Sequence, residues 1–398
     1  MYRDIFEEEM ARGSVFKDQS KLSPDYVPGE LVHREEEFRE LIRLFRSVLE
    51  DRASQRVLIT GSVGVGKTAL TLRFGEEFES VAKKKGLDLT YVHINCRKQG
   101  TPPMVLHKLT SNLPLGVPRR GFTPQELMER VVDYLKKRDA YLTVTLDELD
   151  YFVRQNGPDL LYSLTRTAEE SGGPSRLSMI ATAHSSNFLD RVDDATKSTF
   201  MHNSIDLDKY NAEQLADILK QRMKVAFKSG MVEEGTIELI SDISARRGDA
   251  RFALELLWFA GRIASQGEVE EVSPNHVRKA KSKIHPGIRR EVLGDLSKHE
   301  LLFLLGLSRR LKISDGAYSV TGDVEEAYKV VCEEYGEEPR THTQFWKYIG
   351  RIENLGLIDT ELAGEGYRGR SQRISISDAP PDMMEDEIEE LLDNLYKK

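Results

Sequence analysis

The feature that most constrains the fold of this chain is the stretch 57–70, where an apolar run leads into a glycine-rich loop. The run Val57-Leu58-Ile59-Thr60 suits a strand that is covered on both faces. It continues into Gly61-Ser62-Val63-Gly64-Val65-Gly66-Lys67-Thr68, which has the form G-x-x-x-x-G-K-T. Apolar side chains then recur at helical spacing, at Leu70, Phe74 and Phe78. The order strand, loop, helix predicts a P-loop that binds nucleotide phosphates.

The residue types in this loop match the chemistry of a nucleotide and its metal. Backbone N–H groups of the loop converge on phosphate oxygens, and the following helix directs its positive end at the anion. We expect Lys67 to reach the β and γ phosphates and Thr68 to give its hydroxyl to Mg²⁺. The alternative, a glycine turn with no ligand, is disfavoured by the strand–loop–helix context. The loop residues predicted to bind nucleotide are Gly64, Val65, Gly66, Lys67, Thr68 and Ala69.

Length and composition describe a soluble protein of two or three domains. The chain has 398 residues, 39% hydrophobic and 31% charged, and no apolar run approaches the roughly 18 residues of a membrane span. The N-terminus, 1–9, is acidic and lacks the apolar region of a signal peptide. Cys96 and Cys332 are the only cysteines, which excludes a zinc site built from cysteines and argues against a disulfide framework. These features predict a cytoplasmic protein.

Strand and helix patterns alternate in the first half of the chain, which predicts a parallel α/β sheet. Helices are expected at 35–49, 124–137 and 158–171. Further strands are expected at 90–95, 141–146 and 177–183. The segment 97–122, with a helical stretch at 105–113, interrupts the alternation and is read as an excursion from the sheet.

Polar residues follow two of the predicted strands. The strand 141–146 ends in Asp147-Glu148-Leu149-Asp150. A carboxylate at this end of a strand beside a P-loop can hold the Mg²⁺ shell, predicted for Asp147, and Glu148 can orient or deprotonate the attacking water. Such a pair is also a common strand ending, but the P-loop upstream favours the catalytic role. His184 follows the strand 177–183, where it either contacts the γ-phosphate or is an ordinary loop residue.

From Asn211 onward the pattern is helical, which predicts a second domain at about 209–285. Asn211 and Gln214 fit a capping box at its first helix. Gly248-Asp249-Ala250-Arg251 opens a later helix. Arg251 is placed to meet a phosphate across the cleft; the alternative is a solvated ion pair at the helix start.

A third unit, at 286–381, has the pattern of a winged helix. Helices are expected at 297–307, 324–334 and 341–355, followed by strands at 356–362 and 372–376. The helix 341–355 has an apolar side and a side that donates hydrogen bonds, as in a helix that enters the DNA major groove. Thr341 and Gln344 also fit a capping box, a structural role that competes with DNA reading.

Charge is distributed unevenly over this unit and the tail that follows it. The net charge of −9 argues against a nucleic-acid binder, but residues 382–398 hold seven acidic side chains against two lysines, while 340–376 hold six cations against four carboxylates. Arginines of the hairpin are expected to approach phosphate or the minor groove. The tail is read as an amphipathic helix, and a winged helix that binds protein instead of DNA stays open. The predicted DNA-contacting residues here are Arg340, Thr343, Gln344, Lys347, Arg351, Tyr367, Arg368, Arg370 and Arg373.

The order of these features resembles the archaeal replication initiator family related to the eukaryotic origin recognition complex and its helicase-loading cousin. The residues that carry the resemblance are the lead-in 22–28 with His33-Arg34-Glu35, the P-loop, 147–150, 210–222, 248–251 and the C-terminal wing. The resemblance implies an AAA+ base at 1–208, a helical lid at 209–285, a winged-helix DNA-binding domain at 286–381 and an acidic tail at 382–398. It also implies roles for several residues at the nucleotide. Val27, Pro28, His33 and Arg34 are expected near the adenine, Tyr210 and Arg222 beside the nucleotide, and Arg251 as the lid-borne sensor.

The resemblance further implies ligands and partners. These are ATP or ADP with Mg²⁺, double-stranded origin DNA, the replicative helicase and other initiator paralogues, with no membrane and a nucleoid-associated location. The insertion at about 97–120, with Arg119 and Arg120, is expected to contact DNA beside the wing. Two positions depart from the family pattern: His184 stands where an Asn is usual, and Ala195 where an arginine finger is expected. A missing finger disfavours stimulated hydrolysis between like subunits.

The expected function is therefore an ATP-regulated, sequence-specific initiator in which slow hydrolysis acts as a switch. One alternative is a signalling ATPase whose winged helix is a protein-binding latch. Such proteins normally continue into repeats, whereas this chain ends in a short acidic tail. A second alternative, a ring-forming remodelling ATPase, is disfavoured by Ala195.

Overall fold

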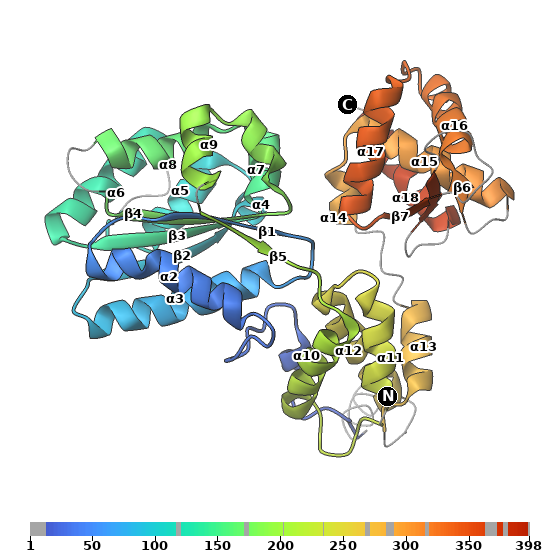
Figure 1. Ribbon diagram of the computed structural model, residues 1–398, viewed down its shortest axis with the longest axis horizontal. Coiled ribbons are helices and arrows are strands. Elements are labelled where there is room, and N and C mark those ends of the chain that lie inside the picture. The colour runs from blue at the N-terminus through green and yellow to red at the C-terminus, as the bar shows by residue number, and fades with distance from the viewer. Residues whose placement is uncertain are drawn as a thin grey trace, which may run out of the picture. The chain divides into compact units, whose positions relative to one another are not determined.

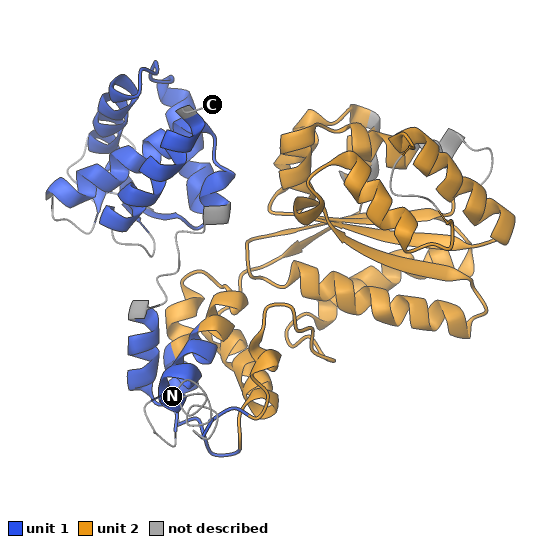
Figure 2. Cartoon of the chain, turned by 180° about the vertical axis from the view of Figure 1, so that it is seen from behind, with its two compact units in different colours: residues 1–16, 229–239, 256–398 blue, residues 17–228, 240–255 orange. Residues whose placement is uncertain are grey.

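The computed structural model describes residues 13–116, 121–170, 175–201, 203–233, 235–266, 271–283, 290–314, 318–362, 372–376 and 381–396 (Figure 1). By internal contacts the chain divides into two compact units (Figure 2). One consists of residues 17–228 and 240–255, and the other of 1–16, 229–239 and 256–398. Within the described ranges, no helix has both the length and the apolar content needed to cross a bilayer.

A five-stranded parallel sheet forms the centre of the first unit, with the strand order β2-β3-β4-β1-β5. The strands are β1 (Arg56–Gly61), β2 (Leu89–Asn95), β3 (Tyr141–Asp147), β4 (Leu177–Ala183) and β5 (Ser204–Leu207). Every residue of β3 and β4 is buried, as expected of strands covered on both faces. The four predicted strands are confirmed. β5 was not predicted, because it is four residues long and two of them, Ser204 and Asp206, are exposed.

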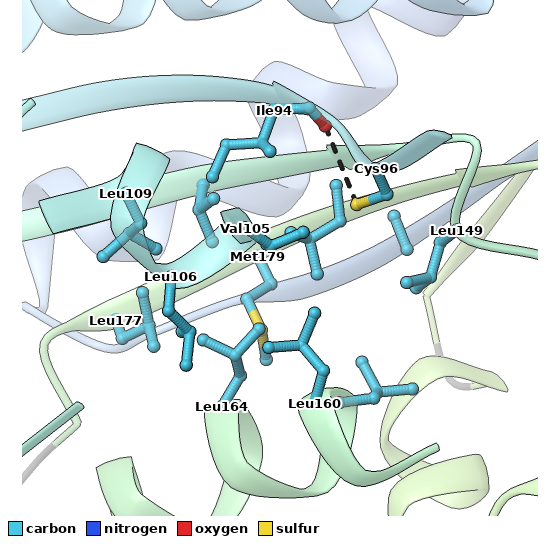
Figure 3. Packing of buried hydrophobic residues seen from close by; sticks show 14 of the residues in the cluster. Ile94, Cys96, Val105, Leu106, Leu109, Leu149, Leu160, Leu164, Leu177 and Met179 are labelled. Carbon is cyan, nitrogen blue, oxygen red and sulfur yellow. Dashed lines mark hydrogen bonds between the residues drawn. The ribbon is translucent and has the colours of Figure 1, made fainter. Parts of the chain in front are cut away.

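Helices cover both faces of this sheet (Figure 1). On one face, α2 (Glu35–Glu50) and α3 (Lys67–Lys84) pack their aromatic residues onto β1, with Phe45 and Phe74 at the centre. The opposite face is covered by α5 (Pro102–Ser111), α6 (Pro124–Arg138), α7 (Leu149–Asn156) and α8 (Asp159–Glu170). Figure 3 shows this second core, where Leu106, Leu160 and Leu164 surround Met179. Short elements complete the unit, namely η1 (Gln19–Leu22), α4 (Cys96–Gln99), η2 (Ser186–Arg191) and α9 (Asp194–Met201).

The sheet places the chemistry at one edge. In parallel strands all carboxyl ends lie together, so the residues after β1, β3 and β4 meet above the start of α3. The register confirms this for two neighbours, because Asn95 of β2 pairs with Asp147 of β3.

Four helices follow the sheet in sequence: α10 (Ala212–Ala226), α11 (Thr236–Ala245), α12 (Ala250–Gln266) and α13 (Pro274–Lys283). The predicted capping box at Asn211 is confirmed, since its side chain accepts from the N–H of Gln214 and the Gln214 side chain accepts from the N–H of Asn211. Of the two cysteines, Cys96 lies in the sheet core and Cys332 in the winged-helix core, and both are free and buried.

The C-terminal part has the predicted winged-helix elements. Its helices are α14 (Arg290–Gly294), α15 (Lys298–Ser314), α16 (Thr321–Glu334) and α17 (His342–Asn354). Its antiparallel sheet has the order β6-β8-β7, with β6 (Ser319–Val320), β7 (Ile358–Leu362) and β8 (Gln372–Ile376). Strands β7 and β8 are confirmed, whereas β6 has only two residues and was not predicted. The predicted capping box at Thr341 is wrong, because the Thr341 side chain makes no capping hydrogen bond.

The acidic segment forms a helix, α18 (Pro381–Tyr396), that belongs to the winged-helix core. Met384, Ile388 and Leu392 are buried in this core. Arg309 of α15 pairs with Glu385 and Glu389 of α18 at 3.0 and 2.7 Å. The sequence left open whether this amphipathic helix packs on the body, and the structure shows that it does.

Candidate nucleotide site and DNA-binding face

The P-loop has the backbone of a phosphate cradle. Gly61, Gly64 and Gly66 have φ values of 149°, 78° and 95°, which L side chains rarely adopt. At Gly64 a Cβ atom would lie 1.8 Å from an Oδ1 atom of Asp249, so only glycine fits. Helix α3 begins directly after Gly66, and its first N–H groups therefore face the loop. These features fit a bound polyphosphate.

Lys67 lies within this cradle. Its ammonium donates hydrogen bonds to the carbonyl oxygens of Gly61 and Ser62, at 2.6 and 2.8 Å. Burial lowers the pKa of Lys67 to about 8, although nearby carboxylates, Asp150 first among them, act to raise it. A cation held by two neutral carbonyls at a site where it is partly desolvated would gain from an anion. Lys67 thus lies within the loop that is expected to hold the phosphates, and its contact with phosphate stays a prediction.

Thr68 and Asp147 meet at the predicted magnesium position. The Thr68 hydroxyl donates to Oδ2 of Asp147 at 2.9 Å, and the hydroxyl of Thr182 on β4 makes a short hydrogen bond to Oδ1. Among the described residues no cluster of three or more His, Cys, Asp or Glu could hold a metal by itself. One hydroxyl and one carboxylate fit Mg²⁺, which prefers oxygen and usually takes its other ligands from water and substrate phosphates.

Glu148 occupies a constrained backbone position next to Asp147. It has a φ of 56°, and its N–H donates to the Thr182 hydroxyl at 3.1 Å. Two residues contact its carboxylate: Asn95 donates at 3.4 Å, and a guanidinium nitrogen of Arg97 lies 3.7 Å away. Thr182 and Asn95 were not predicted as site residues. Their position is the signal that could have identified them, since both lie near the carboxyl ends of strands next to β3.

His184 forms a pair with Asp150. The Asp150 carboxylate, at 2.9 Å from Nδ1 of His184, also accepts from the His184 backbone N–H at 3.2 Å. Burial of Asp150 acts to raise its pKa, but hydrogen bonding and charge from His184 outweigh this and lower it. His184 is therefore held by the half-buried carboxylate of Asp150. It also lines a cavity of about 300 Å³ with Gly61, Ser62, Ser185 and Asp206, among other residues.

The start of α12 touches the P-loop directly. The N–H of Ala250 donates to the carbonyl oxygen of Gly64 at 3.2 Å, and the buried Asp249 lies against Gly64. Arg251 is exposed, and its charge acts to lower the pKa of Lys67. Its position is compatible with the sensor role, which stays a prediction.

Arg34 connects the segments around the loop. It is buried, and it donates to the carbonyl oxygens of Val65 at 3.1 Å and Asp208 at 2.7 Å. Its guanidinium carbon lies 4.0 Å from the ring centre of Tyr210, whose hydroxyl would be 3.2 Å from a Cβ at Gly66. Arg34 and Tyr210 thus pack against the P-loop at Val65 and Gly66. Contact of Arg34 with the adenine and of Tyr210 with the nucleotide stays a prediction.

The other residues predicted at the adenine lie on the lead-in, and Arg222, predicted beside the nucleotide, lies on α10. Nε2 of His33 lies 2.9 Å from Asp217 on α10. Arg222 is buried and donates to the carbonyl oxygen of Tyr26 at 3.0 Å, with its guanidinium over the Tyr26 ring. Arg222 therefore holds the lead-in segment that contains Val27 and Pro28. A direct contact between Arg222 and nucleotide stays a prediction.

Cations of the winged helix divide into two groups. Within the described part of 298–376, six Lys and Arg residues form ion pairs with carboxylates. Arg309, Arg310 and Arg351, for example, pair with carboxylates. By contrast, Arg340, Lys347 and Arg373 have no acidic partner among the described residues. Unpaired cations on one domain are the groups that phosphates can recruit.

Arg351 pairs with a carboxylate, and its contact with DNA stays a prediction. Its guanidinium lies 2.8 Å from the buried carboxylate of Glu300 and 3.4 Å from the carbonyl oxygen of Asp295. The side chain thus ties α17 to the first turn of α15 and to the segment before it. Thr343 and Lys347 are exposed on α17, and Gln344 is half-buried there. The predicted residues Arg119, Arg120, Tyr367, Arg368 and Arg370 lie outside the described residues.

Three known domain families match the chain in order. A domain described as an AAA domain matches residues 51–188. The Cdc6 AAA+ ATPase-type lid domain matches 216–282, and the C-terminal winged helix domain of CDC6 matches 291–386.

Similarity to a known protein extends over nearly the whole chain. The chain is 38% identical to ORC1-type DNA replication protein 2 of Sulfurisphaera tokodaii, over 99% of this chain and 95% of that protein. It belongs to the archaeal ORC1-type family of DNA replication initiators. Cdc6p of Pyrobaculum aerophilum, a solved structure, has 31% identity and a TM-score of 0.62 over 96% of this ORC1-type chain and 100% of its own. The ORC1 protein of Aeropyrum pernix, solved in complex with DNA, has 29% identity and a TM-score of 0.67 over 95% and 97% of the two chains.

This ORC1-type membership confirms the resemblance and the fold class predicted from the sequence: an α/β AAA+ base, an all-α lid and a winged helix. At the two positions that depart from the family pattern, the chain has His184, which is held by Asp150, and Ala195. The cations nearest to Ala195 in sequence are Arg191 and Lys197.

Proposed function

We propose that this chain is an ATP-regulated initiator that binds origin double-stranded DNA in a sequence-specific manner and helps recruit the replicative helicase. The observation that carries the proposal is the pairing of a preformed phosphate cradle at Lys67 with a winged helix that has unpaired cations. Membership in the replication initiator family supports it. Localisation with the nucleoid follows from the proposed DNA binding.

At the nucleotide site, each residue has a defined part. When nucleotide binds, the ammonium of Lys67 exchanges the carbonyl oxygens of Gly61 and Ser62 for the β and γ phosphates. The first N–H groups of α3 bind the same anion. Thr68 and Asp147 would hold Mg²⁺, which supplies charge neutralisation at the phosphates. Glu148 orients water, with Asn95 and Arg97 beside its carboxylate. Slow turnover at this site would suit a switch.

On DNA, the exposed face of α17 would enter the major groove and the base of the wing would approach the backbone. Lys347 and Thr343 are exposed there for base or phosphate contacts. Arg351 is assigned to the fold of the winged helix, because Glu300 binds it. The face of α17 proposed to read DNA therefore consists of the exposed residues Thr343 and Lys347.

Nuclease footprinting on fragments of the source genome tests sequence-specific binding. We expect protection of a discrete site by the wild type, and the same site at reduced occupancy with Lys347→Ala. Uniform protection at all sequences would contradict sequence specificity, and no protection would contradict DNA binding. Recruitment of the helicase is tested separately, by retention of the purified replicative helicase on origin DNA only when the initiator is bound.

A further inference from the structure

Tyr318 and Arg373 form a pair at the base of the wing. The guanidinium carbon of Arg373 lies 4.5 Å from the ring centre of Tyr318. Arg373 has no carboxylate or hydrogen-bond acceptor among the described residues, and its Nε atom is buried without a partner. The Tyr318 ring, which is 45% exposed, is thus the one described group that holds this cation.

The strand register places both side chains on the solvent face of the small sheet. Arg373 of β8 lies opposite Val320 of β6, and Tyr318 precedes Val320 by two residues. Successive strand residues alternate between faces, so Tyr318, Val320 and Arg373 share one face. The opposite face holds the buried Ser319 and Ile374. A diagonal neighbour at this spacing is within reach of an aromatic ring.

The backbone beneath Arg373 is fixed. The hydroxyl of Thr321 donates to the carbonyl oxygen of Gln372 and accepts from its N–H, both at 3.0 Å. On the other side, the backbone of β8 is held by β7, where the Cα of Glu361 lies opposite that of Arg373 in the antiparallel register. Only the Arg373 side chain is therefore free to rotate, and Tyr318 limits that rotation.

We propose that Tyr318 is a positioning residue for DNA binding, which presents the guanidinium of Arg373 to a backbone phosphate. The inference rests on the proposed DNA-binding function. An aromatic face attracts a guanidinium and leaves its charge and its in-plane N–H donors available. A carboxylate partner would occupy those donors, as Asp323 does for Arg310 at 2.7 Å. Because Tyr318 already restricts the Arg373 side chain in the free protein, less side-chain conformational entropy is lost when DNA binds.

The test is a salt series of binding by the full chain to a fluorescent duplex DNA of mixed sequence, because phosphate contacts do not depend on sequence. Arg373→Ala is expected to weaken binding and to reduce the salt slope by about one unit. Tyr318→Leu keeps apolar bulk without an aromatic face and should weaken binding about two- to fivefold. Tyr318→Phe keeps the ring and should restore binding to within about twofold of wild type.

Two double variants separate positioning from a general effect. Adding Tyr318→Leu to Arg373→Ala should cause no further loss, because the residue that Tyr318 positions is gone. Added to Lys347→Ala, Tyr318→Leu should weaken binding by the same factor as it does in the wild type. Wild-type binding by Tyr318→Leu, equal losses with Phe and Leu, or independent losses with Arg373→Ala would each overturn the proposal.

Failure of this proposal is distinguishable from failure of the proposed function. If Arg373→Ala binds like wild type while Lys347→Ala is impaired, the role of Tyr318 and Arg373 is overturned and DNA binding stands. If the wild type does not bind duplex DNA even at low salt, both are overturned. Thermal melting of each variant checks that the exposed Tyr318 position tolerates the changes.

Discussion

The ammonium nitrogen of Lys67 lies 2.6 Å from the carbonyl oxygen of Gly61, six residues earlier in the same loop. The side chain expected to bind phosphate is thus held by the loop that surrounds it. This relationship ties nucleotide binding to the protonation state of one lysine.

Affinity for ATP should therefore depend on pH above the pKa of Lys67. Burial lowers this pKa to about 8, and the phosphates would raise it again. Below pH 8 Lys67 is charged with or without nucleotide, so affinity is flat. Above pH 8 binding must take up a proton, and affinity should fall by up to about tenfold per pH unit. Titration calorimetry in two buffers of different ionisation enthalpy measures that uptake.

The exposed Lys83 of α3 supplies the control for this effect. Lys83→Ala should show the same pH dependence as wild type. Constant affinity up to pH 9.5 would contradict the account. By the same linkage, the nucleotide-free protein gains stability as the pH rises from about 8 towards 10.5, since the unfolded chain keeps the lysine proton over that range.

The Asp150–His184 pair should act as a unit in hydrolysis. Asp150→Asn keeps the size of the side chain but removes the charge that holds the imidazole, and we expect about a tenfold lower turnover with ATP affinity little changed. In a His184→Asn background the same change should have no further effect on turnover. Independent losses in the double variant would show that Asp150 does not act through His184.

A helical glycine of α3 tests the packing behind the P-loop. A Cβ at Gly75 would lie 2.0 Å from the ring of Tyr91, whose hydroxyl is bonded to the carbonyl oxygen of Thr71 at 2.7 Å. Gly75→Ala should lower the free energy of unfolding by about 2–3 kcal/mol. Gly350 of α17 has open space at the same position, so Gly350→Ala should be neutral or stabilising by up to about 1 kcal/mol. Equal effects in denaturant titration would contradict the packing described here.

Long, strongly patterned elements were predictable because their signals are local. Local sequence patterns are enough to identify the P-loop, the strands 90–95, 141–146 and 177–183, and the helix starting after Asn211. Elements β5 and β6 were missed, since a strand of two to four residues has too few positions to show alternation. Their existence depends on partners far along the chain, β1 and β8.

Side-chain partners were less predictable than side-chain positions. The sequence marks Arg34, Arg222 and Arg351 as site residues, yet each is bound to groups distant in sequence: Val65, Tyr26 and Glu300. Periodicity assigns a residue to a face of a helix but does not identify what that face meets. For the same reason, the pairing of α18 with Arg309 followed only from the structure.

Arg351 and Lys347 should therefore separate stability from DNA binding. Arg351→Ala leaves Glu300, which is 2% exposed, without its cation and should lower the free energy of unfolding by about 2 kcal/mol. Lys347→Ala should leave stability unchanged and weaken DNA binding. Denaturant titration and duplex binding on both variants check this. A stable Arg351→Ala protein with lost DNA binding would return Arg351 to the DNA-reading face.

Regulation of DNA binding by nucleotide is the central claim, and it requires a protein that holds ATP without turning it over. Glu148→Gln keeps the size of the side chain but removes the carboxylate that orients water, so it should bind ATP as the wild type does and hydrolyse none. An unchanged steady-state rate would refute that role for Glu148.

The most direct measurement is footprinting of one genomic site by Glu148→Gln with ATP, with ADP and without nucleotide, over a range of protein concentrations. The account predicts protection of the same sequence in all three states, with an occupancy curve or footprint boundary under ATP that differs from that under ADP. Identical curves and boundaries in the three states would contradict it.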